Sequence, residues 1–299
     1  MTTISTDAPI VLVTGASGFL GGAVCRYFAA RGFRVRALVR QPDLNSDFHY
    51  DLPYTLDPRA FEGRPFAVIH CAHDRNATNG TVNVKGALHL RDLCRKHAVP
   101  HFVFISSLAS HASAQSTYGK SKYETEQALD LNVDTVLRPG TIIGSGGLFS
   151  KTRELVNKMP LLPLFYPEAR LQTVWLDDVC EGLFQVLSKR LTGSFSIADE
   201  TGTPMREYYA GIAALVGKSP WIVSLPGDLF LPPLRLLELL ARPFGLGLPI
   251  TAENLLGLKC LKIFDVSADL KALGVQAATF KESLLKLVQL EKRLNSCDF

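Results

Sequence analysis

The chain has 299 residues, of which 47% are apolar, and it carries a formal net charge of +4 at pH 7. This length and apolar content suffice to bury one large α/β core and a small appended lobe. The charge is small, and Lys and Arg residues are scattered among Asp and Glu, so binding to nucleic acid is not expected.

The termini, cysteines and longest apolar stretch indicate a cytoplasmic protein. Residues 1–7 lack the basic and apolar regions of a secretory signal, and the six cysteines form no CxxC pair, which predicts reduced thiols. Prolines and charges interrupt the stretch 225–250, so it is too short to span a membrane. We expect it to pack the small lobe, with a lid over an apolar substrate or peripheral membrane contact as alternatives.

Strand and helix patterns alternate from the start of the chain. A strand at Ile10–Thr14, a helix at Phe19–Arg31 closed by Gly32, and a strand at Arg34–Val39 form a βαβ unit. Further strands are predicted at 66–71, 101–106, 133–137 and 195–198, with helices near 80–97, 118–130 and 177–188. This order predicts an α/β protein with a Rossmann-type, doubly wound parallel sheet.

After about residue 140 the alternation weakens, and amphipathic helices are predicted near 203–217, 229–241 and 279–294. We expect residues 1–165, with contributions from about 170–200, to form the nucleotide-binding domain. Residues 166–299 would mainly form a smaller substrate-binding lobe.

The glycines of Thr-Gly-Ala-Ser-Gly-Phe-Leu-Gly, at 14–21, lie between the first strand and the first helix. Backbone N–H groups and the helix dipole can bind a pyrophosphate there without interference from a Cβ atom. We therefore predict a dinucleotide site formed by Gly15, Ser17, Gly18, Phe19, Leu20 and Gly21.

Arg40 follows the second strand, where folds that prefer NAD commonly place a carboxylate on the adenosine ribose. A cation at this point favours the 2′-phosphate of NADP(H), with NAD(H) as the alternative. Arg36 either assists Arg40 or lies on a solvated strand face.

Tyr118 and Lys122 are four residues apart on a predicted helix and therefore share a face, whereas Lys120 points elsewhere. A phenol has a pKa near 10, and a neighbouring ammonium group favours the phenolate and so lowers that pKa. Ser106 and Ser107 end a predicted strand at the carboxyl edge of the sheet, and either hydroxyl could polarise a substrate carbonyl.

These motifs resemble the extended short-chain dehydrogenase/reductase family, also called the NAD-dependent epimerase/dehydratase family. The resemblance covers nearly the whole chain. It includes the segments Ile69-His70-Cys71-Ala72-His73, Asn83-Val84-Lys85-Gly86, Leu137-Arg138-Pro139-Gly140-Thr141 and Trp175-Leu176-Asp177-Asp178-Val179.

The resemblance implies a catalytic triad of Ser107, Tyr118 and Lys122, in which Tyr118 moves the proton while the cofactor moves hydride. Other residues that would border the cofactor are Cys71, Ala72, His73, Asn83, Ser106, Pro139 and Thr141. Arg170 resembles a phosphate-contacting arginine of sugar-nucleotide relatives, although a surface role is equally compatible. Residues 108–111 replace an aromatic-containing segment of those relatives, which predicts an open rim.

We expect an NADP(H)-dependent oxidoreductase that interconverts a ketone and a secondary alcohol, on a nucleotide-linked keto sugar. The alternatives are a nucleotide-sugar 4-epimerase with tightly held NAD, a dehydrogenase of an apolar sterol-like alcohol, and a non-catalytic NADP(H)-binding subunit or regulator. The resemblance also allows a homodimer through helices 80–97 and 118–130. No metal is expected, and Asp177 and Asp178 are interpreted as N-cap and first-turn charges of a helix.

Overall fold

The computed structural model describes residues 8–43, 47–75, 80–241, 248 and 250–296. The amino-terminal segment 1–7, Cys297 and part of the apolar stretch 225–250 lie outside the described residues. Within the described chain, Cys25, Cys71, Cys94, Cys180 and Cys260 are free thiols. None of the described helices is long and apolar enough to cross a membrane.

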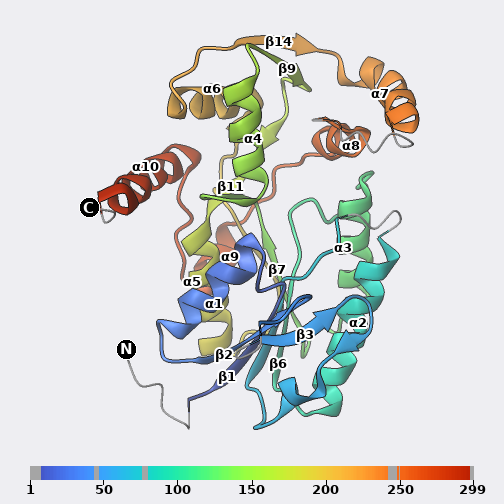
Figure 1. Ribbon diagram of the computed structural model, residues 1–299, viewed down its shortest axis with the longest axis vertical. Coiled ribbons are helices and arrows are strands. Elements are labelled where there is room, and N and C mark those ends of the chain that lie inside the picture. Colours follow the sequence, from blue (N-terminus) through green and yellow to red (C-terminus); the bar gives the residue numbers. More distant parts are fainter. Residues whose placement is uncertain (1–7, 44–46, 76–79, 242–247, 249, 297–299) are drawn as a thin grey trace.

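The main sheet has eight strands in the order β12-β7-β6-β5-β1-β2-β3-β4 (Figure 1). All neighbouring strands are parallel except the β3 and β4 pair. The strand order reverses between β1 and β5, which makes a crevice at their carboxyl ends and confirms the doubly wound fold. The bounds are β1 Ile10–Thr14, β2 Arg34–Val39, β3 Asp47–Asp51, β4 Thr55–Leu56, β5 Ala67–His70, β6 His101–Ile105, β7 Thr135–Pro139 and β12 Gly193–Ile197.

The smaller lobe lies beyond the carboxyl edge of this sheet (Figure 1). It contains three two-stranded sheets, β8 with β11, β9 with β14, and β10 with β13. Its strands are β8 Thr141–Ile143, β9 Leu161–Phe165, β10 Arg170–Leu171, β11 Thr173–Trp175, β13 Thr203–Pro204 and β14 Trp221–Leu225. Its helices are α4 Gly147–Lys158, α6 Met205–Leu215, α7 Gly227–Ala241, α8 Ala252–Lys259 and α10 Phe280–Ser296.

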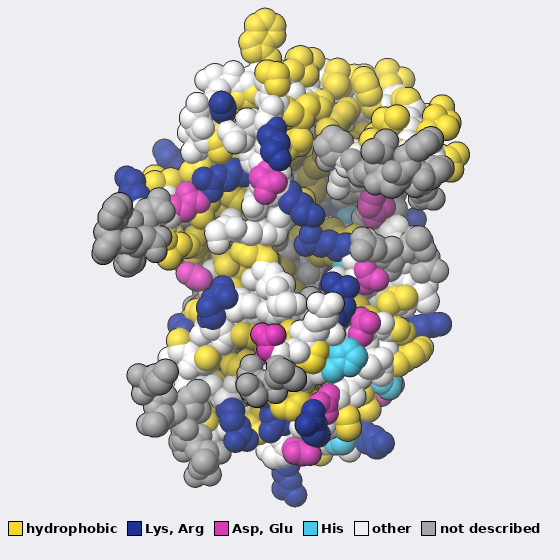
Figure 2. All heavy atoms as spheres, viewed as in Figure 1, with side chains coloured by type: hydrophobic (Ala, Val, Ile, Leu, Met, Phe, Trp, Pro, Cys, Tyr) yellow, Lys and Arg dark blue, Asp and Glu magenta, His cyan; other side chains and the backbone are white. Residues whose placement is uncertain are grey.

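Helix α7 corrects one expectation, because most of its apolar side chains are not packed into the lobe. Five of its leucines are between 49 and 71% exposed, namely Leu229, Leu236, Leu237, Leu239 and Leu240. Hydrophobic side chains accordingly cover much of the surface over α7 and β14 (Figure 2). The amphipathic pattern predicted the helix correctly but not which side of it meets protein.

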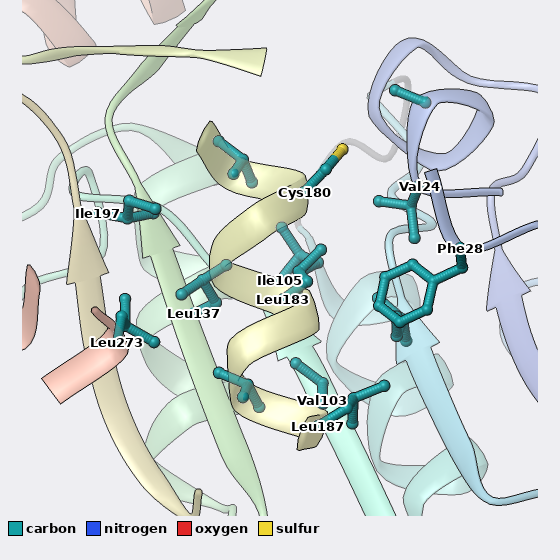
Figure 3. Packing of buried hydrophobic residues seen from close by; sticks show 14 of the residues in the cluster. Val24, Phe28, Val103, Ile105, Leu137, Cys180, Leu183, Leu187, Ile197 and Leu273 are labelled. Atoms are coloured by element: carbon teal, nitrogen blue, oxygen red, sulfur yellow. The ribbon is translucent and has the colours of Figure 1, made fainter. Parts of the chain in front are cut away.

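Alternating residues of the parallel strands face two separate apolar layers. On one face, α1 (Phe19–Ala29), α5 (Leu176–Ser188) and α9 (Ser267–Leu273) pack with Val103 and Ile105 of β6. Figure 3 shows Leu183 of α5 and Phe28 of α1 among the side chains of this layer. Phe102 and Phe104 point to the other face, where they meet α2 (Thr81–Lys96).

Two acidic residues begin α5 differently from the prediction. Trp175 is the N-cap residue, so Asp177 and Asp178 both lie in the first turn and neither caps the helix. Asp177 accepts a hydrogen bond from the Trp175 indole at 3.2 Å, and Asp178 accepts one from the backbone N–H of Ala278 at 2.8 Å. Asp178 therefore joins α5 to the chain that precedes α10, whereas the bond of Asp177 stays within the start of α5.

Candidate active site

The turn between β1 and α1 requires its glycines. Gly15 has φ +64°, and a Cβ atom on it would lie 2.9 Å from the Cα of Ala72. A Cβ on Gly21 would lie 2.2 Å from the carbonyl oxygen of Gly15, and the Gly18 N–H donates to that same oxygen at 2.8 Å. The turn is therefore as tight as a pyrophosphate cradle needs.

The first turn of α1 is well suited to bind an anion. Its N-cap, Gly18, supplies no side-chain hydrogen bond, and the turn contains no acidic residue. The first backbone N–H groups therefore remain available, and the helix dipole favours negative charge. Ser17 and Gly18 are exposed, whereas the side chain of Leu20 packs against the main core.

Phe19 has a different environment from the other residues of the cradle. Cβ atoms added to Gly144, Gly146 or Gly147 would lie between 2.5 and 2.8 Å from its ring. The loop between β8 and α4 thus packs closely on the Phe19 ring, and only the backbone N–H of Phe19 remains for a phosphate. This contact was not predicted from the sequence, although the run Gly-Ser-Gly-Gly at 144–147 signals a close approach of the backbone.

Hydrogen bonds fix the segment that follows β5 beside the cradle. Thr14 Oγ1 lies 2.8 Å from His70 Nδ1 and accepts the backbone N–H of Ala72 at 3.1 Å. The Asn83 side-chain amide accepts the backbone N–H of Asp74 at 2.7 Å and donates to the Asp74 carbonyl oxygen at 2.9 Å. This pairing positions Cys71, Ala72 and His73 at the crevice, while the Asn83 side chain itself is buried.

Arg36 lies within β2 and Arg40 directly follows that strand, and their side chains have different environments. Arg40 is exposed, and none of the described residues holds its guanidinium by a hydrogen bond or ion pair. Arg36 instead donates to the carbonyl oxygens of Ala60 and Glu62, both at 2.6 Å. The Arg36 guanidinium is therefore bound to the segment that follows β4, whereas the Arg40 guanidinium is free of such contacts within the described chain.

The catalytic helix predicted from Tyr118 and Lys122 is α3, Thr117–Gln127. Ser116 caps it by accepting the Gly119 N–H at 3.1 Å, and Glu253 of α8 accepts the Tyr118 N–H at 3.0 Å. Glu253 thus joins the smaller lobe to the first turn of α3. No motif in the sequence indicated that contact, because the two residues are 135 positions apart.

Ser107 and Tyr118 lie together at the crevice, where the Ser107 side chain acts on the phenol. Tyr118 is 38% exposed as a residue, yet burial around its hydroxyl raises the pKa of the phenol, which Ser107 and Arg75 partly oppose. The expected lowering by Lys122 is therefore not what the structure shows. A phenol with a raised pKa is protonated at neutral pH, which is the form that a proton donor needs.

Lys122 is buried and donates to the carbonyl oxygen of Ile105 at 2.6 Å. Its Nζ lies 5.9 Å from the centre of the Tyr118 ring, too far for a hydrogen bond to the ring face but on the same side of α3. Burial lowers the pKa of Lys122 to about 8, although Cys71 and Glu126 act in the opposite direction. The Lys122 ammonium group therefore lies near the Tyr118 ring, while its hydrogen bond goes to the backbone of β6.

His73 lies against Tyr118, with ring centres 5.0 Å apart and planes at 85°. Burial, with smaller contributions from Lys122 and Arg75, lowers the pKa of His73 to about 3. The imidazole is therefore neutral at physiological pH. Its edge-to-face contact restricts where the phenol ring can lie.

The structure separates the two serines at the end of β6. Ser106 is 1% exposed, and its hydroxyl donates to the carboxylate of Glu126. Arg138 Nε donates to both oxygens of that carboxylate at 3.0 Å. Ser106 therefore belongs to a buried polar network beneath the crevice, whereas Ser107 is half-buried.

The remaining predicted contacts lie on the side of the lobe. The Pro139 carbonyl oxygen accepts the Leu108 N–H at 3.1 Å, and the Thr141 N–H donates to Gln172 at 2.9 Å. The first bond holds the end of β7 beside the segment that follows Ser107, and the second joins the chain after β7 to the residue between β10 and β11. Arg170 donates to the carbonyl oxygens of Gly202 at 2.8 Å and Thr201 at 3.3 Å, so its guanidinium is already bound to backbone.

The segment that follows Ser107, which forms the rim, contacts the carboxyl-terminal part of the chain. His111 Nε2 lies 3.0 Å from the carbonyl oxygen of Cys260. Lys262 Nζ donates to Ser113 Oγ at 2.6 Å. These polar contacts tie the rim to residues that are distant in sequence.

Comparisons with known proteins agree with this geometry. The model of the NAD dependent epimerase/dehydratase family matches residues 11–194. A ceramide reductase from Caulobacter vibrioides is 30% identical over 248 residues, which cover 75% of this chain and 76% of that protein. A 2-alkyl-3-oxoalkanoate reductase from Stenotrophomonas maltophilia is 26% identical over 256 residues, covering 69% and 76%.

Solved structures show the same fold. A UDP-glucose 4-epimerase from Thermotoga maritima superposes with a TM-score of 0.71 at 19% identity, over 95% of this chain and 99% of that one. An epimerase from Methanothermobacter thermautotrophicus gives a TM-score of 0.72 at 16% identity, over 94% and 91%. The chain belongs to the NAD dependent epimerase/dehydratase family and is an NAD(P)-binding enzyme.

Proposed function

We propose that this enzyme is an NADP(H)-dependent reductase that interconverts a ketone and a secondary alcohol on a substrate with a long alkyl chain. The observation that carries the reaction type is the position of the Tyr118 phenol beside Ser107, at the edge of the glycine cradle. The cradle fits a dinucleotide because any Cβ atom there would collide with backbone. Bound NADPH would supply the hydride.

The residues of the chain would then divide the remaining chemistry. The Tyr118 hydroxyl donates its proton to the substrate oxygen that becomes the alcohol, while Ser107 hydrogen-bonds to the same oxygen and orients it. Lys122 holds the nicotinamide ribose and stabilises the phenolate that remains after proton transfer. Asn83 and Thr14 act indirectly, because they fix the backbone beside the cradle.

The substrate class is inferred from two features outside the triad. The smaller lobe presents exposed leucines on α7, a surface suited to apolar material. The two relatives described above are reductases whose names denote substrates with alkyl chains. The nucleotide-linked keto sugar expected from the sequence has less support, since Arg170 is bound to backbone carbonyls.

A panel of ketones tests this proposal directly. Oxidation of NADPH by the purified protein should be followed with 3-oxo esters of increasing chain length and with a nucleotide-linked 4-keto sugar. We expect kcat/KM to rise by about fourfold for each added methylene until the pocket is filled, because each buried methylene contributes roughly 0.8 kcal/mol. Turnover of the keto sugar with no dependence on chain length would contradict the alkyl substrate.

Cofactor preference is tested at Arg40, whose free guanidinium we assign to the 2′-phosphate of NADP(H). Arg40→Ala should raise the Kd of NADPH by about tenfold or more, since a hydrogen bond to a charged group contributes roughly 1.5–3 kcal/mol. The Kd of NADH, which lacks this phosphate, should change little. Fluorescence titration measures both, with Arg293→Ala on α10 as the control, and an equal loss for the two cofactors would refute the assignment.

A further inference from the structure

Exposed apolar residues of β14 and α7 form one continuous surface, which we call the apolar face. Single exposed leucines are common on proteins, but a cluster of this kind marks an interaction site. The cluster is visible over β14 and α7 in Figure 2. Its members are Trp221, Val223, Leu229, Phe230, Leu236, Leu237, Leu239 and Leu240.

The acidic residues of α7 are both directed to partners within the lobe. Asp228 pairs with Lys259 at 2.8 Å and accepts the Tyr166 hydroxyl at 2.9 Å. Glu238 accepts the backbone N–H of Ala252 at 2.7 Å, at the start of α8. Arg235 is exposed and has no such partner among the described residues. Arg235 therefore remains free to meet an anionic surface.

A cleft of about 570 Å³ adjoins the apolar face where α4 ends and β14 begins. Its lining includes Lys158, Lys218, Leu161 and Trp221. In the part of the chain that the structure describes, neither lysine side chain has a hydrogen bond or an ion pair. Trp221 is 78% exposed, so an indole and two free ammonium groups occupy the same edge. This combination suits the boundary between lipid headgroups and acyl chains.

The apolar face is connected to the catalytic helix. Helix α7 packs on α8, and Glu253 of α8 accepts the backbone N–H of Tyr118. The apolar face is therefore linked to the candidate active site through α8.

We propose that the apolar face docks on an anionic lipid bilayer, with Trp221 and the α7 leucines at the acyl boundary and with Lys158 and Lys218 on lipid phosphates. This inference deepens the proposed function, on which it rests, because it gives an alkyl-chain substrate a source. A second copy of the chain is a poorer occupant. A twofold interface would bring the same lysines of both copies towards each other, which is unfavourable.

Co-sedimentation of the full chain with vesicles tests the apolar contribution. The vesicles contain either phosphatidylcholine alone or phosphatidylcholine mixed with phosphatidylglycerol, and the unmodified protein should prefer the mixed vesicles. The double variant Leu236→Ser/Leu240→Ser should lose at least about tenfold in affinity, since burial of each leucine contributes roughly 1.5–3 kcal/mol. The control Leu285→Ser/Leu294→Ser changes equally exposed leucines of α10 and should bind as the unmodified protein does.

The charge contribution is tested by Lys158→Glu/Lys218→Glu. Each lysine near an anionic surface contributes about 1 kcal/mol, so the variant should bind the mixed vesicles at least about 20-fold more weakly. The control Lys96→Glu/Lys292→Glu alters two exposed lysines on α2 and α10 and should lose much less. Circular dichroism establishes that all the variants are folded.

Failure of the unmodified protein to bind the mixed vesicles would overturn the docking proposal. If that protein then sedimented as a dimer that Leu236→Ser/Leu240→Ser converts to monomers, the occupant of the apolar face would be a second copy of the chain. The proposed function fails separately, because it requires turnover of ketones dissolved without any lipid.

Discussion

Tyr118→Phe should lower kcat for ketone reduction by about 10²–10⁴-fold, the contribution typical of a positioned proton donor. Phenylalanine keeps the ring and its contact with His73 but removes the hydroxyl that meets Ser107. The Kd of NADPH should stay within about twofold, because the glycine cradle and Arg40 are unchanged. Single-turnover kinetics and fluorescence titration measure the two effects independently.

Tyr123→Phe is the matched control, since Tyr123 lies on the same helix, is half-buried and is remote from the triad in our assignment. It should turn over normally. If Tyr118→Phe also retained full activity, Tyr118 would not be the proton donor. If the unmodified enzyme bound NADPH but reduced no ketone, the epimerase and the non-catalytic subunit would become the better interpretations.

Arg138→Ala should destabilise the fold by about 3–5 kcal/mol, because it leaves the buried carboxylate of Glu126 without its partner. The Glu126 side chain is only 3% exposed, and Arg138 supplies its charge compensation. The melting temperature should fall by on the order of 10 °C for a chain of this size. Thermal unfolding monitored by circular dichroism measures the change.

Arg153→Ala provides the comparison, since the Arg153 and Glu291 side chains are 31 and 33% exposed and such pairs contribute less than about 1 kcal/mol. The further variant Arg138→Ala/Glu126→Gln should recover part of the lost stability, because a neutral amide is less costly to bury than a carboxylate. Equal effects of Arg138→Ala and Arg153→Ala would show that burial gives the Glu126 pair no special importance.

The apolar pattern of α7 predicted a helix but did not determine which of its side chains are buried. A helix that packs in a core and a helix that faces a membrane or another apolar surface carry the same leucine spacing. The pattern near 229–241 therefore predicted the helix, and α7 spans Gly227–Ala241. Which leucines meet protein depended on the arrangement of β14 and α8 around that helix, and no local signal encodes that arrangement.

The sequence by itself determined the features that depend on neighbouring residues. Strands β1 and β2 have the predicted bounds, because their apolar runs are closed by a glycine turn and by Arg40. Tyr118 and Lys122 lie on one helix as their spacing required. Only the tertiary structure distinguished Ser107 from Ser106, bound Arg36 to the carbonyl oxygens of another segment, and raised the pKa of Tyr118. Hydrogen-bond partners and desolvation depend on residues far apart in the chain, and these meet only when the sheet and the lobe have assembled.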